Sequence, residues 1–141
     1  MPEPGQDVLV EVTLSGRQDE PWTRRICRDG AVWEHTNLRT WVQDGAVCQE
    51  HRPLAWEHVT TAPPEALAAI QAVIDRFELL SAAPPAGATT VFGAGVTVWR
   101  LVGADGVHEI RLDNVPPDAV PGLRELDEAV QLAVAMGVSP D

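Results

Sequence analysis

The chain has 141 residues, a length at which one domain around one hydrophobic core is the usual arrangement. Hydrophobic residues make up 45% of it and charged residues 22%, which excludes the composition of a disordered protein. The formal net charge of -11 disfavours nucleic acid and anionic membrane surfaces as partners, since both repel a protein of that sign. We expect a single domain over residues 1–141, with flexible ends at 1–7 and 138–141.

The first part of the chain is predicted to form an antiparallel meander. Val8 to Leu14 alternates apolar and polar residues with the period of a half-buried strand. A returning strand is predicted over Trp22 to Cys27. The turn sequence Arg28-Asp29-Gly30 then leads to a third strand over Ala31 to His35.

The segment from Asn37 to Val59 gives a weaker strand pattern. Asp44-Gly45 indicates a hairpin turn, because both residue types tolerate the left-handed backbone conformation that tight hairpins need. Arg52-Pro53 interrupts the pattern, since proline has no amide hydrogen to donate to a neighbouring strand. Short, irregular strands are therefore expected here.

A helix is predicted next, capped by Thr60 or Thr61 and ending near Ser81. Its first turn holds Pro63 to Glu65, where proline's missing amide hydrogen is tolerated and a carboxylate favours the helix dipole. Apolar residues at helical spacing predict a buried face. That face comprises Leu67, Ile70, Ile74 and Phe77, with Val73 and Leu80 beside it. The segment Ala82 to Gly87 is predicted to be a loop.

The last part of the chain is predicted to be a hairpin followed by a helix. Gly103 to Gly106 is a strong turn signal between strands that together run from Val96 to Leu112. The first of these strands is apolar on both faces, so it is either covered on both sides or central in the sheet. The helix is predicted from Asp118, as its cap, to Met136, closed by Gly137. Its buried residues are predicted to be Leu123, Leu126, Val130 and Val134.

This order of elements predicts an α+β fold: an antiparallel sheet of meander and hairpin strands with two helices packed on one face, in the order β-β-β-(β)-α-β-β-α. A Rossmann or P-loop nucleotide site is excluded, because Gly93-Ala94-Gly95 opens a strand, whereas phosphate-binding glycines lead into a helix.

Residues that could carry catalysis or hold a metal are few. Cys48 and His51 have a spacing that one metal ion could bridge, but a zinc site usually needs a second close pair, and Cys27 and His58 do not supply one. The favoured interpretation is unreactive thiols and exposed histidines. No nucleophile motif occurs. We therefore expect no metal, no cofactor and no enzymatic activity.

Other ionisable residues are interpreted as surface residues. His35 and His108 alternate with glutamates along predicted strands, so they point away from those neighbours and towards solvent. The carboxylates on the last helix lie beside Arg124 on a polar face. They are Glu125, Asp127 and Glu128.

The tryptophans are the unusual feature of the composition. Five tryptophans stand against two phenylalanines and no tyrosine, and four of the five fall between residues 22 and 56 among several arginines. Tryptophan and arginine are the residues most enriched at the centres of protein interfaces, although these rings could instead fill the core. The predicted partner-binding residues are Trp22, Arg24, Trp33, Arg39, Trp41 and Trp56.

Location and source are inferred from composition. No apolar run reaches the length of a membrane span and residues 1–7 lack the features of a secretory signal, so a cytoplasmic location is expected. Arginine is used to the exclusion of lysine, as in GC-rich genomes, which favours a bacterial source.

The chain also resembles the emfourin family, small bacterial inhibitors of thermolysin-like metallopeptidases. The resemblance lies in Val8 to Leu14 with Ser15-Gly16, the helix end at Ala72 to Leu80, the Val96 to Leu112 hairpin and Val115-Pro116-Pro117 before the last helix. It implies the fold predicted above and an inhibitory activity.

The chain departs from that family at several places. Ser15-Gly16 stands where the family has two glycines, and the family's Asp and Tyr near the third-quarter strand have no clear match around Gly95 and Trp99. Arg39 to Val59 resembles an insertion. No inhibitory residue is carried over.

Our leading hypothesis from the sequence is a non-enzymatic protein-binding module, with inhibition of a metallopeptidase as the specific case that the resemblance implies. One alternative is a ligand-binding or enzymatic domain with a pocket between sheet and helices, which needs convergent polar groups. A second alternative is a self-associating structural protein, so the chain is expected to be a monomer or a homodimer.

Overall fold

The computed structural model describes residues 7–15, 22–82, 96–113 and 120–138, with the side chains of residues 15, 37–41, 52, 54 and 113 outside the description. The elements follow one another as β1 (Val8–Ser15), β2 (Trp22–Cys27), β3 (Ala31–Gln43), β4 (Ala46–Thr61), α1 (Pro64–Arg76), the 3-10 turn η1 (Leu79–Ser81), β5 (Val96–Gly103), β6 (Gly106–Asp113) and α2 (Leu123–Met136).

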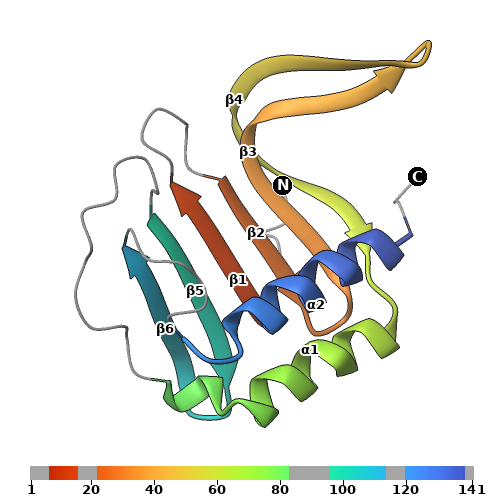
Figure 1. Ribbon diagram of the computed structural model, residues 1–141. Helices are drawn as coiled ribbons and strands as arrows, with labels where there is room; N and C mark the ends of the chain where they lie inside the picture. Colours follow the sequence, from red (N-terminus) through yellow and green to blue (C-terminus); the bar gives the residue numbers. More distant parts are fainter. Residues whose placement is uncertain (1–6, 16–21, 83–95, 114–119, 139–141) are drawn as a thin grey trace.

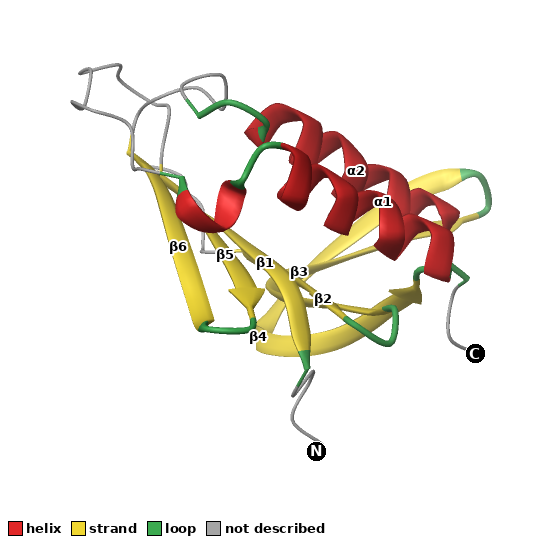
Figure 2. Cartoon of the chain, turned by 90° about the horizontal axis from the view of Figure 1, so that it is seen from below, coloured by secondary structure: helices red, strands yellow, loops and turns green. Residues whose placement is uncertain are grey.

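The strands form one antiparallel sheet in the order β4-β3-β2-β1-β5-β6. Both helices cover the same face of this sheet (Figure 2). The α+β class and the antiparallel sheet with helices on one face are therefore confirmed. β5 lies between β1 and β6, which agrees with the prediction from its two apolar faces.

The core lies between the sheet and the helices because each element has an apolar side. Along β1, Val10 and Val12 point into this layer, whereas Glu11 and Thr13 point to the other face of the sheet. The side chains with almost no exposure come from both layers. They include Ile26, Val32, Ile70, Leu79, Leu101, Ile110, Leu123 and Leu126.

β3 and β4 are much longer than predicted, with 13 and 16 residues, so the expectation of short, irregular strands was wrong. The Asp44-Gly45 turn is confirmed, with φ of 53° and 80°. Pro53 does not end β4. Instead the register shifts there, from the pair Thr36↔Ala55 to the pair Leu38↔His51.

This register shift separates two parts of the β3–β4 hairpin. Pairing between β2 and β3 stops at Thr23↔His35, so the residues after His35 pair only with β4. Residues 36–55, which we call the arm, project beyond the rest of the sheet and bend away from it (Figure 1).

The predicted helix ends need correction. Pro63, not a threonine, is the N-cap of α1, and no side chain caps this helix. Thr60 and Thr61 belong to β4, and the Thr60 side chain is buried where Gly137 packs against it. α1 stops at Arg76 because Glu78 adopts a left-handed conformation with φ 51°.

Two further predictions about the helices differ from the structure. Leu80, expected beside the core, is 39% exposed in the turn η1. α2 begins at Leu123 with Gly122 as its N-cap, and it ends at Met136 before Gly137, as predicted. The predicted cap, Asp118, lies outside the described residues. Residues 83–87 of the predicted loop and the Gly93-Ala94-Gly95 segment lie outside them too.

Of the two ends expected to be flexible, the structure describes only Asp7 and Val138, and both are hydrogen-bonded through their backbones; residues 1–6 and 139–141 lie outside the described residues. The Arg28 amide donates to the Asp7 carbonyl at 2.9 Å, and Val138 and Thr61 exchange two backbone hydrogen bonds of 3.0 Å. Within the described ranges, neither helix is long and apolar enough to cross a membrane.

Candidate partner-binding surface

The face of the sheet opposite the helices, which we call the open face, carries polar and aromatic side chains in two rows. No helix of the described ranges covers this face (Figure 2). The strand register places six residues directly opposite one another across all the strands. From β6 to β4 they are Glu109, Arg100, Glu11, Arg25, Trp33 and His58.

The second row runs beside the first. It consists of Arg111, Val98, Thr13, Thr23, His35 and Trp56. The Thr13 and Thr23 hydroxyls hydrogen-bond each other at 3.1 Å. Neighbouring residues in such rows are close enough to interact, so the open face is a continuous surface of paired side chains.

Glu11 is the centre of an ion-pair network on the open face. Its carboxylate accepts a hydrogen bond from Arg25 Nε at 2.7 Å and another from Arg100 Nη1 at 3.1 Å. Arg100 Nε also lies 3.3 Å from the Glu109 carboxylate. The Glu11 side chain is only 13% exposed, so both arginines hold a carboxylate that solvent reaches poorly. Charge-assisted hydrogen bonds of this kind fix the planes of the guanidinium groups.

The β2–β3–β4 end of the open face carries an aromatic cluster. The Trp33 and His58 rings stack with centroids 5.0 Å apart, and those of His35 and Trp56 lie 4.9 Å apart. The Arg25 guanidinium carbon lies 4.4 Å from the centroid of the Trp56 ring, a cation–π geometry. We call these residues the open-face cluster: Arg25, Trp33, His35, Trp56 and His58.

The cluster and the network share Arg25, which donates to Glu11 and lies over Trp56. Trp56 is therefore in contact with a cation and with the His35 ring, and Trp33 with the His58 ring. All five members of the cluster are half-buried. They form a surface of fixed side chains, not a platform of bare indole faces on which a flat ligand could stack.

The predicted partner-binding residues do not form a single patch. Trp33 and Trp56 come together in the open-face cluster, but Trp22 and Arg24 lie on the helix side of the sheet. There Arg24 Nη2 lies 2.8 Å from the Glu34 carboxylate and its guanidinium carbon 4.7 Å from the Trp22 ring centroid. The cause is strand alternation, because adjacent residues in β2 point to opposite faces.

The remaining predicted residues and the remaining tryptophan belong to other parts of the structure than the open-face cluster. Arg39 and Trp41 belong to the arm, and their side chains lie outside the described residues. Trp99 is in the core, 3% exposed, while Trp22 is half-buried and packs against it. Core and surface interpretations thus each hold for some of the tryptophans.

The sequence analysis did not select the charged residues of the open-face network, nor the two histidines as ring partners of the tryptophans. These residues are Glu11, Arg25, Arg100, Glu109, His35 and His58. Nothing in one strand alone identifies them, because the interactions join residues up to 89 positions apart. The signal that could have identified two of these residues was the alternation of side chains between the two faces of β1 and β2. It places Glu11 and Arg25 on the non-core side of two strands predicted to be neighbours.

The cysteines and histidines do not converge. Within the part of the chain that the structure describes, no three His, Cys, Asp or Glu side chains are placed to share a metal ion. Cys48 and His51 are three residues apart in β4 and so point to opposite sides of the arm. Cys27 is buried, and this burial raises the pKa of its thiol, which disfavours the nucleophilic thiolate.

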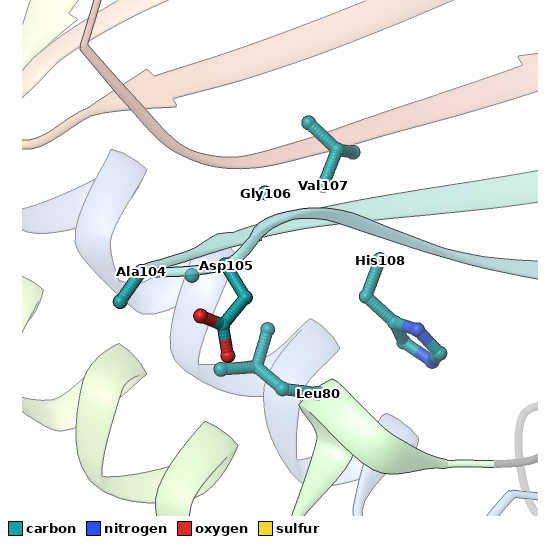
Figure 3. A pocket seen from close by; sticks show the side chains of 7 residues that line it. Leu80, Ala104, Asp105, Gly106, Val107 and His108 are labelled. Carbon is teal, nitrogen blue, oxygen red and sulfur yellow. The ribbon is translucent and has the colours of Figure 1, made fainter.

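A pocket of about 250 Å³ lies at the β5–β6 turn, beside η1 (Figure 3). Asp105 and Leu80 point into the same space, while the His108 ring lies to one side. His108 faces the helix side of β6 rather than solvent, which corrects its predicted position, and its Nε2 is 2.9 Å from the Ala82 carbonyl oxygen. The ionisable side chains in the lining are Asp105 and His108, and no hydrogen bond joins them in the part of the chain that the structure describes.

These observations favour the open face over the pocket at the β5–β6 turn as the candidate binding surface. The open face brings together charged and aromatic side chains from all six strands, whereas the pocket at the β5–β6 turn is small and has two ionisable side chains in its lining, Asp105 and His108. The chain matches no protein-family model and no curated protein sequence.

Proposed function

We propose that this chain is a non-enzymatic protein-binding module that contacts its partner through the open-face cluster. The observation that carries this proposal is the pair Trp33 and Trp56, held beside Arg25 on a sheet face that no described helix covers. Tryptophan and arginine dominate the energetic centres of protein interfaces, because each removes a large area from water and still offers hydrogen-bond donors.

The fixed geometry of this surface supports tight binding. Arg25 is held by Glu11 and Trp56, and each tryptophan ring has a histidine neighbour. Side chains that are already ordered lose less conformational entropy on binding, by about 0.5–1.5 kcal/mol for each side chain. Since its charges are mutually paired, the network leaves no isolated ion to be desolvated.

The competing functions have less support. A ligand-binding or enzymatic domain needs convergent polar groups in a concave site. The pocket at the β5–β6 turn has two ionisable side chains in its lining, Asp105 and His108, and the His108 ring already lies 2.9 Å from the Ala82 carbonyl oxygen. Self-association would bring together copies that each carry a formal charge of -11. That repulsion opposes contact between like surfaces.

For the class of partner we favour a peptidase, with the module acting as its inhibitor. The support is the resemblance to emfourins in the order of elements, from the Val8 to Leu14 strand through the Val96 to Leu112 hairpin to the last helix. One fold hosts many activities, so the partner class has its own test, inhibition of a peptidase by the purified chain.

Affinity capture with matched tryptophan variants tests the role of the open face. We expect the wild-type chain to retain one partner in near-equal amount from a lysate of the source cells, and Trp56→Ala to lose at least about nine-tenths of it, as hot-spot truncations cost 2 kcal/mol or more. Trp22→Ala is the control, because it removes the same side chain from the opposite face of the sheet.

Thermal unfolding of both variants establishes that each is folded at the capture temperature. Equal loss of the partner in Trp22→Ala and Trp56→Ala would argue against the open face. Retention of the partner by Trp56→Ala would exclude the cluster as its binding centre.

A further inference from the structure

The exposed apolar side chains of this acidic chain gather at two places. Eight large apolar side chains of the described residues are exposed, and five of them lie either at the tip of the arm or at the C-terminal end of α2. Monomeric proteins scatter such side chains singly, whereas groups of them mark contact surfaces. Two such groups on one chain indicate a contact in which one group covers the other.

The tip of the arm is the first of these surfaces. Val42 and Val47 stand directly opposite each other beside the Asp44-Gly45 turn and are 70% and 68% exposed. Beyond His35 the strands of the arm pair only with each other in the described residues. A two-stranded ribbon is marginally stable in water by itself, so covering one side of the arm would stabilise it.

The second surface, which we call the helix-end patch, consists of Leu132, Met136 and Val138. Leu132 and Met136 are four residues apart in α2 and are therefore neighbours on one side of the helix. They are 56% and 42% exposed, and Val138, shortly after the helix, is 74% exposed. The tip of the arm lies apart from this end of α2 in Figure 1, so the two surfaces of one copy leave each other uncovered.

Both surfaces lack net charge, although the chain as a whole carries -11. Residues 129–138 include no charged side chain, and the arm has two arginines against one aspartate and one glutamate. The repulsion between two acidic copies is therefore weakest where one arm meets one helix-end patch. An uncharged apolar tip and an uncharged apolar patch need no charged partner, and a second copy supplies each of them with the other.

The length of the arm also keeps the acidic parts of two copies apart. Its six residue pairs beyond the register shift, from Leu38↔His51 to Gln43↔Ala46, span about 20 Å. This is more than twice the Debye length of about 8 Å in physiological salt, so repulsion across the arm is largely screened.

We propose that the tip of the arm packs on the helix-end patch of a second copy, and that the second copy's arm makes the same contact in the opposite direction. The product is a closed two-fold dimer, in which two chains form two contacts. A head-to-tail chain of copies would leave one arm and one patch uncovered at its ends, so closure is favoured.

The size of the contact indicates a weak dimer. The arm beyond the register shift is about 20 Å long and about 10 Å wide, so one side of it covers roughly 200 Å². Counted on both chains and for both contacts, the dimer buries roughly 800 Å², less than the about 1,200 Å² at which standard stable interfaces begin. We therefore expect a dissociation constant of about 10–100 μM.

The contact leaves the proposed binding surface free. α2 lies on the side of the sheet opposite the open face (Figure 2), so a copy held at the helix-end patch does not cover Trp33 or Trp56 there. The dimer presents two open-face clusters, and a partner with two sites binds it more tightly than it binds one copy. The inference adds an assembly state to the proposed function and does not depend on it.

Sedimentation equilibrium of the full chain between about 5 and about 300 μM tests this inference, because the wild-type chain should pass from monomer to dimer over this range. Val47→Asp and Leu132→Asp should each raise the dissociation constant at least about tenfold, since each buries a carboxylate without a partner. Both side chains are exposed in the monomer, so neither substitution disturbs its core. Val107→Asp is the matched control: Val107 is 64% exposed on β6, outside both surfaces, and its substitution should change the constant less than about twofold.

A double variant distinguishes the arm-to-helix contact from pairing between two arms. Val47→Asp combined with Leu132→Arg brings a carboxylate and a guanidinium together across the contact, so it should associate at least about threefold more tightly than Val47→Asp alone. A wild-type chain that stays monomeric over the whole range would overturn the inference and leave the open-face proposal standing. A dimer that Leu132→Asp leaves intact would overturn it too, because the helix-end patch would then not be part of the contact.

Discussion

Gly30→Ala is expected to lower the free energy of unfolding by about 3 kcal/mol or more, the largest effect of any small substitution in the β-meander. Gly30 has φ +99°, a conformation that L residues adopt only with strain. An added Cβ would also overlap the Ala62 backbone carbonyl oxygen, well inside van der Waals contact distance, and a backbone atom cannot move away as a flexible side chain would. The same residue accepts a hydrogen bond of 2.8 Å from the Ala62 amide, which joins the β2–β3 turn to the end of β4.

Gly45→Ala separates the cost of the backbone conformation from the cost of the close packing. Gly45 also has a positive φ, +80°, but nothing lies within 4 Å of the position of its added Cβ. It should cost only about 1 kcal/mol in urea unfolding, the conformational part alone. If Gly30→Ala and Gly45→Ala destabilise the protein equally, the close packing of the β2–β3 turn against Ala62 is not as described.

Glu11→Ala is expected to destabilise the protein by about 2–3 kcal/mol, because it leaves Arg25 and Arg100 without their shared carboxylate. The Arg25 side chain is 23% exposed and Glu11 is 13% exposed, so water replaces the lost hydrogen bonds only in part. The substitution should also release the Arg25 guanidinium from its position over Trp56, which changes the tryptophan fluorescence of the folded protein.

Glu109→Ala is the control for this network. Glu109 also interacts with Arg100, at 3.3 Å, but its side chain is 51% exposed. Exposed pairs contribute little, so the change in the free energy of unfolding should stay within about 0.5 kcal/mol. Equal effects of the two substitutions would mean that the open-face network is an ordinary solvated surface.

Much of the fold was predictable because local patterns and packing agree. The alternation of Val8 to Leu14 and the turn signals at Arg28-Asp29-Gly30 and Gly103 to Gly106 led to the observed strands and hairpins. The buried face of α1 was predictable from the spacing of Ile70 and Ile74. Each of these signals depends on residues close in sequence.

The predictions that were wrong concern features that depend on contacts between residues distant in sequence. β4 extends over 16 residues because a register shift relative to β3 accommodates Pro53, so its length depends on the neighbouring strand. Thr60, the predicted helix cap, is instead buried against Gly137 at the far end of the chain. Sequence-local reasoning finds a capping residue but not the tertiary contact that uses it.

The candidate site was predictable in composition but not in arrangement. Tryptophan and arginine enrichment indicated an interface, yet Trp22 and Arg24 belong to the helix side and Trp33 and Trp56 to the open face. Arg25, one residue from Arg24, is the arginine that lies over the Trp56 ring on the open face, whereas the sequence analysis selected its neighbour. Only the register between strands distinguishes the two.

Hydroxyl-radical footprinting of the captured complex tests the central claim most directly, since it measures the oxidation rate of each tryptophan with and without the partner. If the open face binds, oxidation of Trp33 and Trp56 falls severalfold in the complex while Trp22, on the opposite side of the sheet, keeps its rate. Protection of Trp22 with Trp33 and Trp56 unchanged would contradict the assignment of binding to this surface.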